Sequence, residues 1–79
     1  MTYVATFYAH FGAVRFNRIC KEKGLASKMM PVPRLLSSSC GTCVQYESDT
    51  ELPEGIFMDE IEQVARVDGD KYTIVFSAD

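Results

Sequence analysis

Residues 31–43 read Pro31-Val32-Pro33-Arg34-Leu35-Leu36-Ser37-Ser38-Ser39-Cys40-Gly41-Thr42-Cys43. Proline cannot donate a hydrogen bond to a strand ladder, so Pro31 and Pro33 belong at a sheet edge or at the end of a strand. The serines that follow are small and polar, as the residues of turns and loops often are. The stretch therefore predicts an edge strand that ends at the prolines and continues into a loop carrying Cys40.

The segments before these prolines predict a strand, a helix and a second strand. Residues 2–8 are rich in β-branched and aromatic side chains, as strands are. Residues 11–23 repeat apolar side chains at helical spacing, and Gly24 follows at the position where helices often end. Residues 25–32 form the second strand. The predicted apolar stripe of the helix consists of Ala13, Phe16, Ile19 and Cys20.

The segments after Cys40 complete a β-α-β-β-α-β pattern. Residues 42–47 alternate as a strand does, with Val44 and Tyr46 on one face and Cys43 and Gln45 on the other. Residues 48–55 read as a loop that contains Pro53, and residues 71–77 as a final strand. We therefore predict an α+β, ferredoxin-like sandwich with two helices on one face of an antiparallel sheet. Its strand order, 4-1-3-2, places the second strand at an edge, in agreement with the prolines.

The second helix has a competing interpretation. Phe57, Ile61, Val64 and Ala65 are spaced as one face of a helix. Asp68-Gly69, however, is also a two-residue hairpin turn, which would pair residues 61–67 with residues 71–76 as strands. We favour the helix.

Length and composition indicate a single domain over residues 1–79. No apolar run approaches the roughly 20 residues of a membrane-spanning helix, and the N-terminus has no signal-peptide pattern. Three cysteines are an odd number for a disulfide framework. We therefore expect a cytoplasmic protein with free thiols and no membrane association.

Charge is distributed unevenly along the chain, whose net charge is −3. Residues 1–40 contain six basic side chains and one acidic one, whereas residues 41–79 contain two basic and ten acidic. A polarised surface of this kind can orient a protein partner. Nucleic-acid binding is not expected, because it needs a denser basic patch.

Cys40 is the main candidate for chemistry. The thiolate is the reactive form of cysteine, and nearby cations or converging N–H groups lower the pKa of a thiol. Arg34 is a candidate cation, and Ser38, Ser39 and a Gly41 with positive φ could form a nest of N–H donors. Such a site would stabilise the terminal anion of a persulfide or perselenide. Cys43 completes a Cys-x-x-Cys pair, either as a resolving thiol or as a small packed residue of the third strand.

The other reactive side chains have structural interpretations. Cys20 belongs to the apolar helix stripe, and His10 begins the first helix. Asp59, Glu60 and Glu62 are interpreted as a solvated helix face. We expect no metal site, because zinc would need two ligands beyond Cys40 and Cys43, and we expect no cofactor.

The pieces Pro31-Val32-Pro33-Arg34 and Ser38-Ser39-Cys40-Gly41 resemble a family of small bacterial and archaeal selenium/sulfur carrier-like proteins. Phe7 near the end of the first strand, Ala13 in the first helix and the closing Gly24 extend the resemblance over most of the chain. The resemblance implies that Cys40 is the carrier cysteine. It also implies that its loop is shaped by a set of neighbours: Pro31, Pro33, Arg34, Ser39 and Gly41.

These observations predict a sulfur or selenium carrier rather than an independent enzyme. It would receive the atom from a desulfurase-type donor and pass it to an acceptor enzyme. A Cys40–Cys43 dithiol oxidoreductase and a non-catalytic binding module are the alternatives. An exposed edge strand leaves homodimerisation open.

Overall fold

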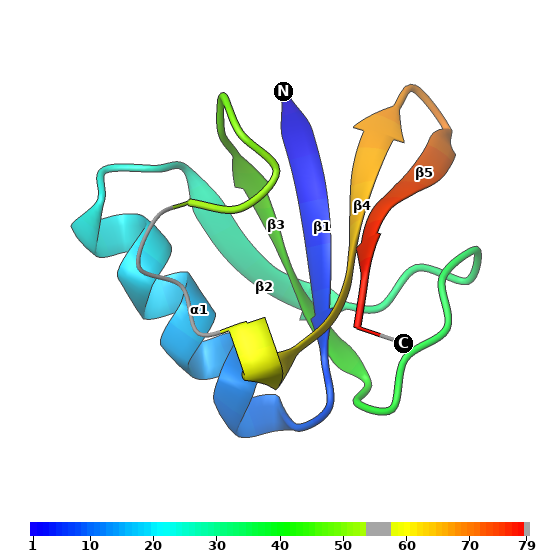
Figure 1. Cartoon of the computed structure of the whole chain (residues 1–79), viewed down its shortest axis with the longest axis horizontal. Coiled ribbons are helices and arrows are strands. Elements are labelled where there is room, and N and C mark those ends of the chain that lie inside the picture. The colour runs from blue at the N-terminus through cyan, green and yellow to red at the C-terminus, as the bar shows by residue number, and fades with distance from the viewer. Residues whose placement is uncertain (54–57, 79) are drawn as a thin grey trace.

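Five antiparallel strands form one sheet in the order β2-β3-β1-β4-β5 within residues 1–53 and 58–78, which the computed structural model describes. The helix α1 connects β1 to β2, and the short 3-10 helix η1 precedes β4 (Figure 1). The elements are β1 (Thr2–Phe7), α1 (His10–Glu22), β2 (Ser27–Pro31), β3 (Thr42–Glu47), η1 (Met58–Glu60), β4 (Ile61–Asp68) and β5 (Lys71–Ser77).

The central strand β1 is buried on both faces. Tyr3, Ala5 and Phe7 pack in the cluster that includes the helix, whereas Val4 packs in a second cluster on the opposite face. Alternation of side chains along a strand produces this division. Both faces of the sheet must therefore be covered.

The helix α1 covers the face formed by β1, β3 and β2. Its buried residues Ala13, Phe16 and Cys20 lie on the predicted stripe, and the Phe16 ring packs between those of Phe7 and Tyr46. The helix begins and ends one residue earlier than predicted. No helix among the described residues is long and apolar enough to cross a membrane.

The end of α1 confirms the role predicted for Gly24, which has a φ of +78°. The Gly24 N–H donates to the Lys21 carbonyl at 3.1 Å, and the Leu25 N–H donates to the Cys20 carbonyl at 2.9 Å. This is the hydrogen-bond pattern of the Schellman motif, in which glycine is favoured at the left-handed position.

The loop from Val32 to Gly41 covers the other face of the sheet (Figure 1). Leu36, in the middle of this loop, packs against Val4, Cys43 and Ala65. The two faces are thus covered differently, one by a helix and the other by the segment that carries Cys40.

The predicted second helix is wrong, and so is the two-helix ferredoxin-like sandwich. Residues 61–68 form β4, which pairs with β1 and makes a hairpin with β5 through Gly69 and Asp70. Gly69 has a φ of +65°, as the first central residue of a type II′ turn requires. The helical stripe also included Phe57, which lies outside the described residues.

A β-bulge explains the helix-like spacing in β4. Thr6 pairs with Gln63 and Phe7 with Ile61, so Glu62 is an extra residue on β4. In a regular strand Ile61 and Val64 would lie on opposite faces, but the bulge brings both into the cluster beneath the helix. Their spacing of three residues therefore imitates a helical repeat.

The two edges of the sheet are β2 and β5. The edge position of β2 was predicted from its prolines, and Pro31 is its last residue. The place beside β1 predicted for residues 71–77 is taken by β4, and these residues form the outer strand β5 instead.

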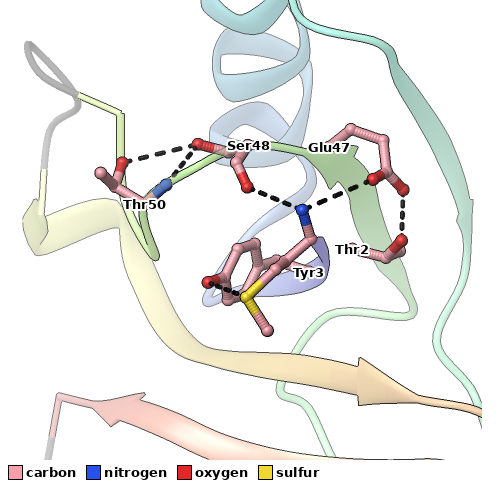
Figure 2. Close-up of polar contacts among 6 residues, drawn as sticks. Thr2, Tyr3, Glu47, Ser48 and Thr50 are labelled. Atoms are coloured by element: carbon pink, nitrogen blue, oxygen red, sulfur yellow. Dashed lines mark hydrogen bonds and ion pairs between the residues drawn. The ribbon is translucent and has the colours of Figure 1, made fainter.

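The N-terminus is bound at the end of the sheet that carries the last residues of β3 (Figure 2). The Met1 ammonium donates to the Ser48 carbonyl at 3.1 Å and lies 3.9 Å from the Glu47 carboxylate. The Thr2 hydroxyl donates to the same carboxylate. These groups are exposed, so their ion pair contributes little to stability.

The hairpin predicts the effect of substituting Gly69. Gly69→Ala should lower the free energy of unfolding by about 1–2 kcal/mol, because an L-residue is strained at this positive φ. The measurement is urea denaturation followed by circular dichroism. Gly41→Ala is the control: Gly41 has no positive φ, and among the described residues beyond its two chain neighbours no atom lies within 4 Å of the position of an added Cβ. Equal effects of the two substitutions would contradict the prediction.

Candidate functional site: the loop that carries Cys40

The loop is closed at its base and anchored in its middle. The Val32 N–H donates to the Gly41 carbonyl at 3.2 Å, and the Leu36 N–H donates to the Pro33 carbonyl at 3.0 Å. The buried Leu36 side chain then fixes the loop against the sheet. Residues 37–41 leave this anchor and lead into β3.

Ser38 connects Cys40 to the end of the central strand. Its hydroxyl donates to the Phe7 carbonyl at 3.3 Å and accepts the Cys40 N–H at 3.2 Å. Cys40 is half-buried and forms no disulfide. The backbone of this cysteine is therefore positioned by a serine that is itself bound to β1.

Glu62 is part of this site, although the sequence analysis assigned it to a solvated helix face. Its carboxylate accepts the Ser39 N–H at 3.0 Å and the Ser39 hydroxyl at 2.8 Å. The neighbouring Gln63 side chain donates to the Ser37 carbonyl at 2.6 Å. The only signal in the sequence for the part that Glu62 and Gln63 play in this site was the alternative interpretation of residues 61–67 as a strand. That interpretation would have placed both side chains on the sheet.

The hydrogen bonds to Glu62 lower the pKa of its carboxyl below the ordinary 4.5. Partial burial acts in the opposite direction, but the Ser39 hydroxyl, the Ser39 N–H and the nearby Ser38 and Thr6 hydroxyls outweigh it. Glu62 is consequently ionised at neutral pH.

Cys43 and Cys20 differ from Cys40 in being fully buried. Burial raises the pKa of the Cys43 thiol to about 11, and this thiol lies 3.6 Å from the Pro31 carbonyl, to which it donates. Burial also raises the pKa of Cys20 to about 11, although Lys21 and Lys23 act against it. Both thiols are therefore protonated and poorly nucleophilic at neutral pH.

The nest of N–H donors expected around Cys40 does not form. Gly41 has no positive φ, and the Ser39 and Cys40 N–H groups donate to Glu62 and Ser38. Arg34 is exposed, and its guanidinium forms no ion pair with the residues that the structure describes. The donors of the loop thus serve to hold the loop itself.

The other predicted site residues lie around the loop, and in the described part of the chain none of them is a hydrogen-bond partner of Cys40. Pro31 ends β2, and Pro33 accepts the turn hydrogen bond from Leu36. His10 begins α1, as predicted, and its Nδ1 lies 3.2 Å from the Thr42 hydroxyl at the start of β3. Among the described residues, no three His, Cys, Asp or Glu side chains gather closely enough to bind a metal ion.

The chain belongs to the family described as "Putative Se/S carrier protein-like", which it matches over residues 2–67. The match includes the Cys40 loop and all of β4 except its last residue, Asp68, and it ends before β5. No curated protein and no solved structure matches the chain. The resemblance seen in the sequence is thereby confirmed at the level of the family.

The different burial of the three thiols predicts selective alkylation. In the native protein iodoacetamide should modify Cys40 and leave Cys20 and Cys43 protected, whereas all three should react in denaturant. Peptide mass spectrometry identifies the modified residues. Modification of Cys43 as fast as Cys40 would contradict the assignment.

The carboxylate contact of Ser39 predicts a titration that can be observed by NMR. The Ser39 amide resonance should move as pH falls, with a midpoint below 4.5, because protonation of Glu62 weakens the hydrogen bond. Since the folded pKa is lowered, this contact contributes stability above the unfolded pKa and loses it as pH falls through the folded value. In Glu62→Gln the Ser39 titration should be absent, and its persistence would contradict the prediction.

Proposed function

We propose that the protein is a small carrier that holds sulfur or selenium on Cys40 as a persulfide or perselenide. It would receive the atom from a desulfurase-type donor protein and pass it to an acceptor enzyme. Membership of the family supports carriage of sulfur or selenium. A cytoplasmic location, where thiols are kept reduced, suits such a protein.

One observation carries the assignment to Cys40: it is the only cysteine of the chain that is not fully buried. A carrier must present its sulfur to two different proteins, and a buried thiol cannot be reached without opening the core. Cys20 and Cys43 also have raised pKa values, which reduces their thiolate content.

Transfer to Cys40 is an exchange between sulfur atoms. The Cys40 thiolate attacks the outer sulfur of the donor's cysteine persulfide, forming the new S–S bond as the donor's S–S bond breaks. The donor cysteine leaves as a thiolate and takes up a proton. In the second transfer a nucleophile of the acceptor attacks the outer sulfur of the Cys40 persulfide, and Cys40 leaves as the thiolate. Neither step needs an external oxidant or reductant.

The bonding of the loop favours transfer over storage. The N–H groups of Ser39 and Cys40 donate to Glu62 and Ser38, so they are not free to stabilise the anionic outer sulfur. A bound atom that the carrier stabilises weakly is released more readily to an acceptor, because release then costs less free energy.

The dithiol alternative assigns a resolving role to Cys43. That role requires a thiolate that can attack Cys40, whereas Cys43 is fully buried with a pKa of about 11. We therefore place Cys43 in the packing of the loop against the sheet and propose no redox exchange with Cys40.

The test is mass spectrometry after incubation with L-cysteine and a cysteine desulfurase. Wild-type protein should gain one sulfur on the Cys40 peptide, and a thiol reductant should remove it. Cys40→Ser should abolish loading, because no other thiol is accessible. The matched variant Cys43→Ala should still be loaded.

Three results would contradict the proposal in different ways. Sulfur loading of the Cys40→Ser variant would show that another cysteine carries the atom. Loss of two protons that links Cys40 to Cys43, without added sulfur, would favour the dithiol oxidoreductase. Neither change, with partner capture surviving alkylation, would favour a binding module.

A further inference from the structure

The bulge in β4 places two consecutive side chains against the Cys40 loop. In a regular strand Glu62 and Gln63 would point to opposite faces of the sheet. Because Glu62 is the extra residue between the pairs Thr6–Gln63 and Phe7–Ile61, both side chains instead contact the loop. Bulges often redirect a side chain next to a functional site.

These two side chains hold the residues on either side of Ser38. Gln63 donates to the Ser37 carbonyl at 2.6 Å, while the Glu62 carboxylate accepts two hydrogen bonds from Ser39, at 3.0 and 2.8 Å. Ser38 itself is bound to the Phe7 carbonyl at 3.3 Å. All three serines before Cys40 are therefore fixed to the sheet.

Glu62 supplies the strongest of these restraints. Hydrogen bonds to an ionised group are stronger than those between neutral groups, and Ser39 gives its carboxylate two of them. Ser39 directly precedes Cys40, so release of Ser39 would free the backbone on one side of the cysteine. The other side leads through Gly41 into β3.

We propose that Glu62 is a positioning residue that latches the Cys40 loop against the sheet and limits access to the thiol. The inference rests on the proposed function in that Cys40 is taken as the reactive group. While the latch is closed, Cys40 stays half-buried, and opening the Glu62–Ser39 contact exposes it. The bulge thus gives the carrier a closed and an open form of one loop.

The experiment measures the reaction of Cys40 with 2,2′-dipyridyl disulfide by stopped-flow absorbance. The Cys40 sulfur attacks the reagent disulfide, forms a mixed disulfide and releases one pyridine-2-thione. Glu62→Ala should accelerate the reaction by roughly five- to tenfold, the range expected when a solvent-exposed hydrogen-bonded contact of ordinary net strength is lost. Ser39→Ala should accelerate it less, because the Ser39 N–H still donates to Glu62. Glu62→Gln, which keeps an acceptor oxygen, should restore part of the protection.

Two further variants separate a local latch from general loosening. Glu47→Gln removes a carboxylate that also accepts from a hydroxyl but lies at the opposite end of β3, and it should leave the rate unchanged (Figure 2). The double variant Glu62→Ala/Ser39→Ala should react as Glu62→Ala does, since the two changes remove one contact. Gln63→Ala provides a second route to loosening the loop should Glu62→Ala fail to fold.

An unchanged rate in Glu62→Ala would overturn the latch, as would an equal acceleration by Glu47→Gln or additive effects of Glu62 and Ser39. These outcomes leave the carrier proposal intact, because sulfur loading of the wild-type Cys40 is measured separately. Conversely, if Glu62→Ala accelerates the reaction of Cys40 but the wild-type protein gains no sulfur, the carrier proposal is wrong and the latch stands.

Discussion

The pairing of β1 with both β3 and β4 is the constraint on which the rest of the structure depends. A strand hydrogen-bonded on both sides and buried on both faces needs a cover over each face of the sheet, because its apolar side chains alternate between them. The helix α1 supplies one cover. The other face is covered by the β2–β3 loop through Leu36, so the segment that carries Cys40 is also part of the protein's second core cluster.

This double role explains how a chain of 79 residues holds a reactive loop in place. Small domains bury little surface, so a long loop without packed side chains would be mobile. Here Leu36 anchors the middle of the loop, and Ser38 and Ser39 bind its last part to β1 and β4. Cys40 follows directly after these contacts. Its surroundings are therefore set by strands that lie far from it in the sequence.

The same packing separates the three thiols chemically. Cys20 lies on the buried face of α1 and Cys43 lies on β3 beneath the loop, and desolvation raises the pKa of both to about 11. Cys40 lies outside both clusters and is half-buried. One fold thus produces two inert thiols and one accessible thiol, which is the distribution that a single-site sulfur carrier needs.

The sequence by itself determined the elements whose signals are local: the strand β1, the amphipathic α1 with Gly24 after it, the alternation of β3 and the edge position of the proline-ended β2. It also pointed to Cys40, since a thiol among serines is not a typical core residue. Only the tertiary structure decided that residues 61–68 form a strand. Ile61 and Val64 are three residues apart, which is a helical spacing, and they share one face of the strand only because of the bulge at Glu62. The tertiary structure alone brought Glu62 to Ser39 across 23 residues. Local periodicity cannot show where a strand contains a bulge, because the bulge in β4 arises from its pairing with β1.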